Sequence, residues 1–436
     1  MAAKKRFSGL LGGLLLLSTA LAQGSEPLER GSVIFFHPDG AGATHWAALR
    51  LVDQGPDGHT RWDQLEAMGL YRGHPLDSIA SSSHAGATTH AYGKKVPKDS
   101  FGMRGTEPLT ALSGAPVSIA MEAHAAGVPT AIVNSGHIAE PGTAVFAASH
   151  PTRREPAAIA AKVLASGLPL ILSGGERYLL PEDVTGFHGE PGTRTDGRNL
   201  LEEARAAGYT VVFDREQLRA LDPAGVAKVL GVFAANQTFH DQSEEDLAAA
   251  GLPLYLPGAP TIGEMTTFAL AFLAAQGEPF LLVAEEEGTD NFPNKGNAPG
   301  MLESLRRADA AIAVALAHVR SHPRTLLLVA ADSNAGNPAL MALDDPDAQD
   351  QPLPTHSRHG APIDGVDGPG SLPFLTAPDA GGQRHPFAIV WPDYGDYHGG
   401  IIARAHGLHS DRLPRHVQNA DIYRLIHATL FGTWLD

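Results

Sequence analysis

Acidic residues follow three apolar runs of the chain. The runs end at Asp39, at Glu285 with Asp290 five residues later, and at Asp332. Continuous apolar runs of this length are typical of strands buried on both faces, and parallel strands present their carboxyl ends at one edge of the sheet. We therefore expect these carboxylates to meet. Because like charges held together are costly unless cations neutralise them, the pattern predicts a site for several metal ions.

A short serine run offers a nucleophile. Ser81, Ser82 and Ser83 precede a predicted helix over residues 86–92 and stand at its N-terminal end. The backbone N–H groups and the positive dipole end of a helix suit a phosphate group there. Serine also favours the role of a helix cap. The run is therefore compatible with phosphate chemistry or with a simple cap.

The elements that would position these residues alternate along the chain. The predicted strands cover residues 33–38, 130–133, 169–172, 210–213, 280–284, 325–331 and 387–391. The predicted helices cover residues 44–52, 86–92, 117–126, 155–165, 200–207, 262–275, 298–319 and 422–431. This alternation favours an α/β fold with a large, mostly parallel central sheet flanked by helices.

The domain organisation follows from composition. Residues 335–385 are rich in Pro, Gly and Asp with little periodicity, which is typical of an inserted functional segment. No polar linker divides the chain, so residues 23–436 are predicted to form one large domain with this loop-rich insertion.

The first 22 residues have the pattern of a signal peptide. A basic segment ending at Arg6 precedes an apolar stretch over residues 10–17 and a small-residue cleavage site at residues 20–22. The pattern predicts export to the periplasm or the extracellular space, with no membrane span after cleavage. The alternative is an uncleaved membrane anchor.

The charge balance restricts the partners. The chain has 48 acidic and 32 basic residues, a net charge of −16, and no cysteine. Nucleic-acid backbone binding is not expected, and thiolate catalysis is excluded. A phosphate-bearing substrate would need local attraction, from metal ions or an arginine.

Five motifs in order along the chain resemble those of alkaline phosphatases. They are residues 36–42 (FHPDGAG), 82–89 (SSHAGATT), 285–290 (EEEGTD), 331–332 (AD) and 398–400 (HGG). The resemblance implies an alkaline phosphatase-like fold and a metal-dependent hydrolase of small phosphate monoesters that acts through a phosphoserine intermediate. It also implies Zn²⁺ and Mg²⁺ as cofactors and allows a homodimer.

The resemblance assigns roles to individual residues. Ser83 matches the nucleophile, and Arg154 matches the arginine that grips the phosphate, with Arg153 as a close rival. Arginine suits that role because its planar fork donates two parallel hydrogen bonds. The implied metal ligands are Asp39, which would bridge two ions, together with Ser83, Thr143, Glu285, Asp290, Asn294, Asp332 and His398.

Three positions depart from the family pattern. Asn294 and Ser333 stand where the family has histidine ligands, and Ser82 stands where it has aspartate. Oxygen ligands favour Mg²⁺, Mn²⁺ or Ca²⁺, whereas imidazole favours Zn²⁺. The centre could therefore hold harder ions. Alternatively, a different histidine could supply the missing ligand; the candidates are His37, His84, His356 and His359.

Some assignments stay open. Glu286 and Glu287 are expected to lie behind the ligands or in solvent, as runs of like charge usually do. A phosphodiesterase on the same scaffold remains an alternative, because the insertion could shape another pocket. A sulfatase on this scaffold is a further alternative, but it normally needs a modifiable Cys or Ser in a distinct motif, and the chain has no Cys. A third alternative is a secreted metal- or phosphate-binding protein with weakened catalysis, which the two missing histidines would explain.

Overall fold

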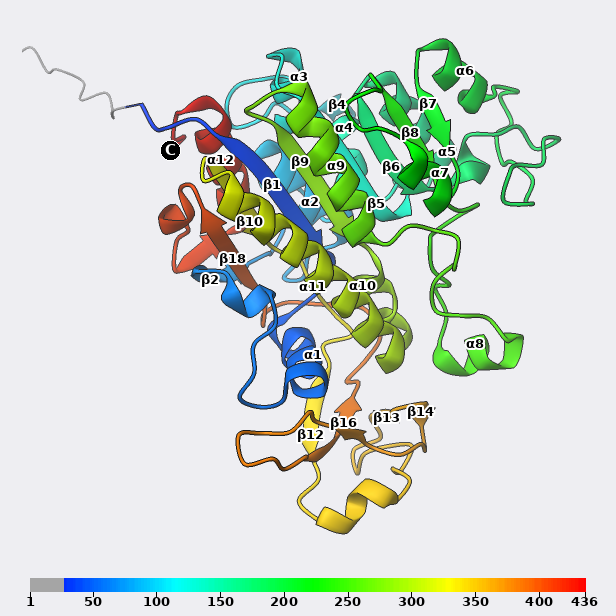
Figure 1. Cartoon of the computed structure of the whole chain (residues 1–436), viewed down its shortest axis with the longest axis vertical. Helices are drawn as coiled ribbons and strands as arrows, with labels where there is room; N and C mark the ends of the chain where they lie inside the picture. The colour runs from blue at the N-terminus through cyan, green and yellow to red at the C-terminus, as the bar shows by residue number, and fades with distance from the viewer. Residues whose placement is uncertain (1–26) are drawn as a thin grey trace, which may run out of the picture.

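Ten strands form one sheet at the centre of the protein (Figure 1). The computed structural model describes residues 27–436. The strands of this sheet are β1 (Ser32–Pro38), β2 (Ala67–Arg72), β5 (Thr130–His137), β6 (Leu170–Gly174), β7 (Thr210–Val212), β8 (Val229–Val232), β9 (Leu281–Glu286), β10 (Thr325–Val329), β18 (Ile402–Gly407) and β19 (His416–Gln418). Their order is β19-β2-β18-β10-β1-β9-β5-β6-β8-β7. The strands from β10 to β7 are all parallel, and only β18 runs against its neighbours, so the predicted fold class is confirmed.

Helices cover both faces of the sheet. They are α1 (Ala43–Gln54), α2 (Ser83–Tyr92), α3 (Ile119–Ala125), α4 (Pro141–Ala147), α5 (Pro156–Ala165), α6 (Leu200–Ala206), α7 (Arg215–Ala220), α8 (Glu244–Ala250), α9 (Ile262–Gln276), α10 (Gly288–Asn291), α11 (Ala298–Ser321) and α12 (Asn419–Phe431). Consecutive residues of β1 face opposite sides. Phe35 packs into the core shared with α2, α4 and α12, and Phe36 into the core shared with α1, α9 and α11. Figure 1 shows α9 and α11 lying across the front of the sheet.

The strand register aligns the acidic residues. His37 on β1 is paired with Glu285 on β9, and Glu285 is paired with Asn134 on β5. On the other side of β1, Phe36 is paired with Val329, three residues before Asp332. The carboxyl ends of β1, β9 and β10 therefore reach the same edge of the sheet together.

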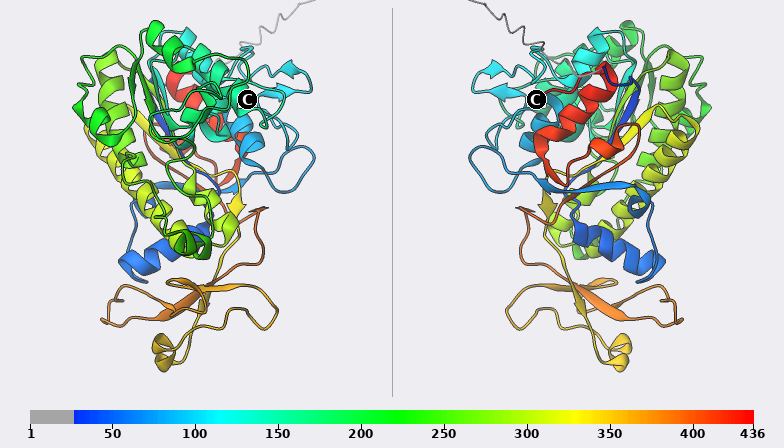
Figure 2. Two further views of the ribbon diagram at one scale, coloured as in Figure 1. Left: turned by 90° about the vertical axis from the view of Figure 1, so that its right-hand side faces the viewer. Right: turned by 90° about the vertical axis from the view of Figure 1, so that its left-hand side faces the viewer.

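The predicted insertion contains a sheet of its own. The strands β12 (Ala339–Ala342), β13 (Ile363–Gly365), β14 (Gly368–Pro369), β15 (Phe374–Leu375) and β16 (Pro386–Val390) form it. Figure 2 shows this small sheet projecting from one end of the main sheet. The strand predicted over 387–391 exists as β16, but it belongs to the small sheet. Its buried residues divide between two cores. Phe387 and Ile389 belong to the core that α1 and α11 line, and Ala388 belongs to a small core within the insertion.

Four strands of the main sheet, β2, β8, β18 and β19, escaped the sequence analysis. Strand β2 exposes Met68 and Leu70 to solvent at 56% and 49%, and β18 carries Arg404 and His406. Such strands lack the continuous apolar run that marks a strand buried on both faces. The predicted signal peptide lies outside the described residues. Within residues 27–436, none of the helices is long and apolar enough to cross a membrane.

Candidate metal centre

Strand β1 delivers two ligand side chains to one point. His37 and Asp39 are two residues apart and therefore face the same side. Nε2 of His37 lies 3.1 Å from Oδ1 of Asp39, 3.9 Å from Oε1 of Glu285 and 4.0 Å from Oδ1 of Asp332. All four side chains are fully buried. The three strand ends thus bring their acids together, and of the four candidate histidines His37 joins them.

A second group of acids lies beside the first. One carboxylate oxygen from each of Asp39, Glu287 and Asp290 lies within 4.8 Å of the others. Glu287 is buried, so of its two expected positions, behind the ligands or in solvent, the solvent position is excluded. Glu286 is buried too, but it points to the other face of β9, where Oε1 accepts hydrogen bonds of 2.8 Å from Tyr255 and Ser135. Asp39 therefore belongs to both groups.

Two glycines make room for these carboxylates. Gly142 on α4 packs against the Glu285 carboxylate, and a Cβ atom there would overlap it. Gly40 follows Asp39 with φ of +64°, and a Cβ at this position would lie 2.6 Å from Oδ1 of Asp290. Glycine adopts positive φ without steric cost. The turn after β1 can therefore bring the chain close to the acids of β9.

The electrostatics of the cluster call for cations. Burial, and then the neighbouring Asp39, raises the pKa of Glu285 and Asp332 well above the ordinary range. Burial also raises the pKa of Asp290, with Asp396 and Asp39 adding to the effect. Buried oxygens without a hydrogen-bond partner occur on several of these residues, including Asp39, Glu285, Glu287, Asp290 and Asp332. Unpartnered carboxylate oxygens in a dry site suit divalent ions, so the donor set fits such ions.

Asp39 is the exception among the acids. Burial alone would raise its pKa, but a hydrogen bond and charge from His37, together with hydrogen bonds from Asp332 and Ser83, hold the pKa below its usual range. The Asp39 carboxylate is therefore ionised at neutral pH and sits at the centre of both groups.

The three serines have different partners. Ser82 is the N-cap of α2, where its Oγ accepts from the Ala85 N–H at 3.3 Å and donates to the Lys98 carbonyl at 2.6 Å. Ser81 Oγ donates to the Ser82 carbonyl at 3.2 Å. Ser83, the first residue of the helix, is buried, and among the three serines it is the one whose hydroxyl lowers the pKa of Asp39. The capping role and the site role thus fall on neighbouring residues.

The side chains of Arg153 and Arg154 point in different directions. Nη2 of Arg153 lies 3.6 Å from Oε2 of Glu140, and Nη1 lies 3.4 Å from Nδ1 of His84. Partial burial opposes the charge on Arg153, but Glu140, Glu287, Asp290 and Asp39 raise its pKa. Arg154, the residue expected from the resemblance, instead lines a surface cavity with other basic side chains. Because consecutive residues of this turn point in different directions, the geometry brings the rival, Arg153, toward the acids.

Thr143 and Glu285 share a hydrogen-bond donor, Asn134. Nδ2 of Asn134 donates to Oγ1 of Thr143 at 2.9 Å and also donates to the Glu285 carboxylate. Both Thr143 and Asn134 are buried. The hydrogen bonds from Asn134 therefore hold Thr143 and Glu285 together.

A further carboxylate, that of Asp396, lies near Asn294 and Ser333, the two positions where histidines were expected. Nδ2 of Asn294 donates to Oδ2 of Asp290 at 3.0 Å, and Oγ of Ser333 donates to Oδ1 of Asp396 at 3.2 Å. Strand β17 (Asp396–Tyr397) pairs with β11 (Asn334–Ala335) and thereby sets Asp396 beside Ser333. Asp396 also contacts Asp290. Oxygen donors therefore surround this side of the centre.

The remaining histidines lie elsewhere. His398 is exposed, with its ring centroid 6.3 Å from that of His74, and the structure does not bring it to the acids. His84 contacts Arg153, whereas His356 and His359 are exposed on the insertion. The sequence analysis missed three residues near the centre; these are Asn134, Glu140 and Asp396. Of these three, Asp396 offered a signal by its position, two residues before a family motif.

Comparisons with known proteins agree with this fold. A family model described as alkaline phosphatase matches residues 31–339. The chain is 29% identical over 368 residues to a streptomycin-6-phosphate phosphatase of Streptomyces griseus, which covers 75% of this chain and 80% of that protein. It is 26% identical over 187 residues to the alkaline phosphatase of Escherichia coli, covering 40% of this chain and 38% of that enzyme.

Solved structures share the fold. The alkaline phosphatase of Thermus thermophilus superposes with a TM-score of 0.70 at 22% identity, covering 96% of each chain. The alkaline phosphatase of the Antarctic bacterium TAB5 has a TM-score of 0.69 at 18% identity, covering 93% of this chain and 99% of that one. A mutant of the TAB5 enzyme, similar at a TM-score of 0.69, is described with Mg bound.

Proposed function

The chain belongs to the alkaline phosphatase family, and we propose that it is a metal-dependent hydrolase of small-molecule phosphate monoesters that acts through a phosphoserine at Ser83. One observation carries the proposal: the buried Ser83 hydroxyl, at the start of α2, lowers the pKa of Asp39, which belongs to a buried acid cluster whose oxygens lack partners. A nucleophile, an N-terminal helix end and a cation-binding donor set thus coincide.

The reaction has two halves. In the first, Oγ of Ser83 loses its proton to solvent and forms a bond to phosphorus, while the bond between phosphorus and the leaving-group oxygen breaks. That oxygen takes a proton from solvent. In the second half, water attacks the phosphoserine, inorganic phosphate is released and the Ser83 hydroxyl is restored. Phosphoryl transfer of this kind depends mainly on positioning and charge neutralisation.

The protein's own groups would hold the phosphate. Backbone N–H groups at the start of α2 face the position of Ser83 and favour an anion there. We assign the phosphate-gripping role to Arg153, because its guanidinium lies among the residues of the site, at 3.6 Å from Glu140. Glu140 and His84 would orient Arg153, in place of the aspartate that the family has at the position of Ser82.

The donors divide into three sets. A magnesium-type ion would be held by Asp39, Thr143 and Glu285; a second ion by His37, Asp39, Ser83 and Asp332; and a third by Asp290, Asn294 and Asp396. Bound there, the ions would neutralise the carboxylates and the phosphate and lower the pKa of the Ser83 hydroxyl. The oxygen-rich third set favours Mg²⁺, Mn²⁺ or Ca²⁺, whereas the imidazole of His37 favours Zn²⁺ in the second.

The substrate is proposed from the relative with the longest match described above. That protein is named for streptomycin 6-phosphate, a phosphorylated aminoglycoside. The net charge of −16 would attract the cationic part of such a molecule, while the phosphate is drawn locally by the ions and Arg153. We therefore propose phosphorylated small molecules with cationic leaving groups as substrates. Export through the predicted signal peptide and assembly as a homodimer remain expectations.

The test compares an aryl phosphate monoester, an aryl phosphate diester and streptomycin 6-phosphate as substrates of the full chain. The proposal expects monoester turnover that EDTA abolishes and that add-back of divalent ions restores. Faster diester turnover would favour the phosphodiesterase alternative. Metal binding without turnover on any substrate would favour the binding protein. Either result would overturn the proposal.

A further inference from the structure

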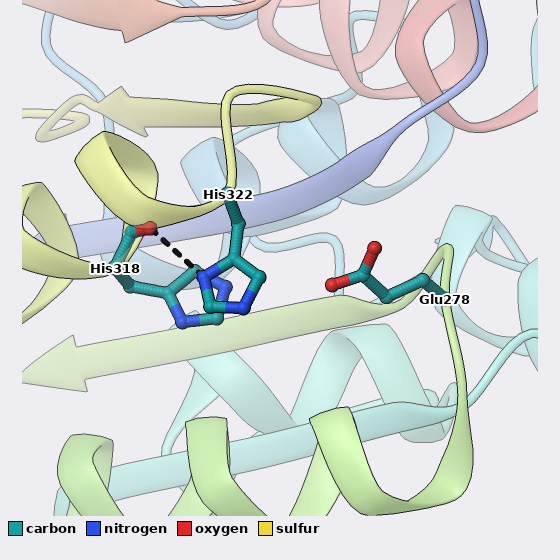
Figure 3. A group of neighbouring side chains, drawn as sticks. All are labelled: Glu278, His318 and His322. Carbon is teal, nitrogen blue, oxygen red and sulfur yellow. Dashed lines mark hydrogen bonds between the residues drawn. The ribbon is translucent and has the colours of Figure 1, made fainter.

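A second group of metal-ligating side chains lies at the opposite edge of the sheet. Glu278 stands in the loop between α9 and β9, and His318 and His322 stand at the end of α11 (Figure 3). One ring nitrogen of each histidine and one carboxylate oxygen lie within 4.8 Å of one another. Glu278 precedes β9 and Glu285 is near its end, so at least about 13 Å of strand separates this group from the acid cluster.

The geometry points to a binding site for a divalent transition-metal ion of the Zn²⁺ class, formed by Glu278, His318 and His322. Two imidazoles and one carboxylate are a donor set that zinc, nickel and copper prefer over Mg²⁺ and Ca²⁺. The site belongs to neither the reaction nor the acid cluster. It would tie the end of α11 to the loop that enters β9.

The helix sets the two rings side by side. Residues four apart lie on one face of a helix, and the rings of His318 and His322 stack with centroids 4.1 Å apart. Phe280 packs edge-on against His318 at 5.5 Å and supports it from the side of β9. Figure 3 shows the Glu278 carboxylate pointing toward the two rings. The three side chains therefore converge from two separate segments.

The hydrogen bonds leave one ring nitrogen of His318 and one of His322 free to bind a metal ion. Nδ1 of His322 lies 3.0 Å from Oγ of Ser321 and 3.1 Å from the backbone carbonyl of His318; because a carbonyl only accepts, and the Ser321 hydroxyl can itself donate to that carbonyl, we assign the proton to Nδ1. Nε2 of His322 then presents its lone pair. A histidine whose other nitrogen donates to a backbone carbonyl is the usual arrangement of a metal ligand. Nε2 of His318 is buried without a hydrogen-bond partner among the described residues.

The ligand atoms are within reach of one ion. Zinc binds imidazole nitrogen and carboxylate oxygen at about 2.0 to 2.2 Å, and the ligand atoms already lie within 4.8 Å of one another. Because an ion lies in the plane of each imidazole that binds it, one of the two stacked rings has to turn out of the stack for both to bind the same ion. Glu278 is exposed, which leaves the remaining coordination positions to water.

The test counts bound zinc by equilibrium dialysis of the tag-free full chain against Zn²⁺, after removal of metals with EDTA. We compare wild type with H322Q and E278Q, and with H416Q as the matched control, because His416 is an exposed histidine on β19. Wild type and H416Q should bind one more zinc per chain than H322Q. E278Q should weaken that extra site about 10-fold or more.

Two further readouts separate this site from the acid cluster. Zinc should raise the melting temperature of wild type more than that of H322Q, whereas the metal-free proteins should melt alike. Phosphate-ester turnover of H322Q at saturating metal should equal that of wild type. Equal zinc content in wild type and H322Q would overturn the proposal, as would an equal loss in H416Q. Both outcomes leave the proposed function of Ser83 untouched.

Discussion

Nε2 of His37 lies 3.1 Å from Oδ1 of Asp39, and both side chains are fully buried among the acids at the carboxyl edge of the sheet. An imidazole therefore stands in the centre of a site where two expected histidines are replaced by Asn294 and Ser333. His37 gives the cluster a nitrogen donor from a different direction. The preference of the site for Zn²⁺ over Mg²⁺ should therefore depend on His37.

Replacing His37 tests this dependence. H37Q removes the imidazole and keeps a polar side chain of similar reach. The affinity for Zn²⁺ should fall by roughly 10- to 100-fold, while the affinity for Mg²⁺ should change little, because imidazole favours zinc and oxygen ligands favour magnesium. Metal content after dialysis against a mixture of both ions measures the change. An unchanged ratio of zinc to magnesium would show that His37 is not a ligand.

The serine run provides its own controls. S83A should lower kcat for a phosphate monoester by at least about 10³-fold, because a nucleophile acts as a unit with the rest of the site. S81A should be close to wild type. S82A should lose the N-cap of α2 and about 1 kcal/mol of unfolding free energy. Steady-state kinetics and denaturant unfolding separate the three. Turnover in S83A at the wild-type rate would reject the assignment.

The neighbouring arginines can be distinguished directly. R153A should lower kcat/KM by roughly 10- to 100-fold, the worth of a charge-assisted hydrogen bond to phosphate. R154A should stay within about 3-fold of wild type, because Arg154 lines a separate surface cavity. Inhibition by inorganic phosphate should weaken in R153A alone. A larger effect from R154A would restore the assignment that the family resemblance implies.

Histidine ligands can be introduced on the oxygen-rich side of the centre. The double variant N294H/S333H supplies imidazole at the two departing positions beside Asp290 and Asp396. Its preference for Zn²⁺ over Mn²⁺ should rise about 10-fold or more in activity restored after EDTA treatment. D396N should weaken metal binding at the same position. No shift in metal preference would mean that these residues do not face a bound ion.

The metal-free protein should lose stability as pH rises. Burial and mutual repulsion raise the pKa of Glu285, Asp290 and Asp332, so the folded state binds more protons than the unfolded state. Their stabilising contribution is present below the unfolded value of about 4 and is lost as pH rises through the raised folded values. Asp39, with its lowered pKa, acts in the opposite sense but is a single group.

Thermal melts of the chelated protein check this sign. The melting temperature should be lower at about pH 8 than at about pH 5, and added Mg²⁺ should raise it more at the higher pH, where the acids are ionised. A chelated protein that melts at the same or a higher temperature at about pH 8 would contradict the raised pKa values.

The sequence predicted the parts of this protein that local patterns encode. Buried parallel strands are continuous apolar runs, so β1, β9 and β10 were recognisable, and the acids at their ends were expected to meet. Strand β2 pairs with β19 and β18, but it alternates buried and exposed residues such as Met68, so it was not recognised. The same dependence on local patterns holds for the candidate site, because Asp39, Glu285 and Asp290 were predicted from their positions at or just after strand ends.

The missed residues depend on tertiary contacts. Asp396 reaches Asp290 only because β17 pairs with β11, and no spacing along the chain encodes that pairing. The choice between Arg153 and Arg154 depends on which way each residue of a turn points, which motif spacing cannot resolve. Glu287 returns to the side of Glu285 by strand alternation. That period was available in the sequence, but the run of like charge led us to expect Glu287 behind the ligands or in solvent rather than among the ligands.

The most direct test of the central claim is to trap the phosphorylated enzyme. Wild type and S83A are incubated with a phosphate monoester and divalent ions, quenched in acid, digested and analysed by mass spectrometry. The account predicts one phosphoryl group on the wild-type peptide that contains Ser83, with the modification on that residue and none in S83A. Phosphorylation of Ser81 or Ser82 instead, or full turnover by S83A, would contradict it.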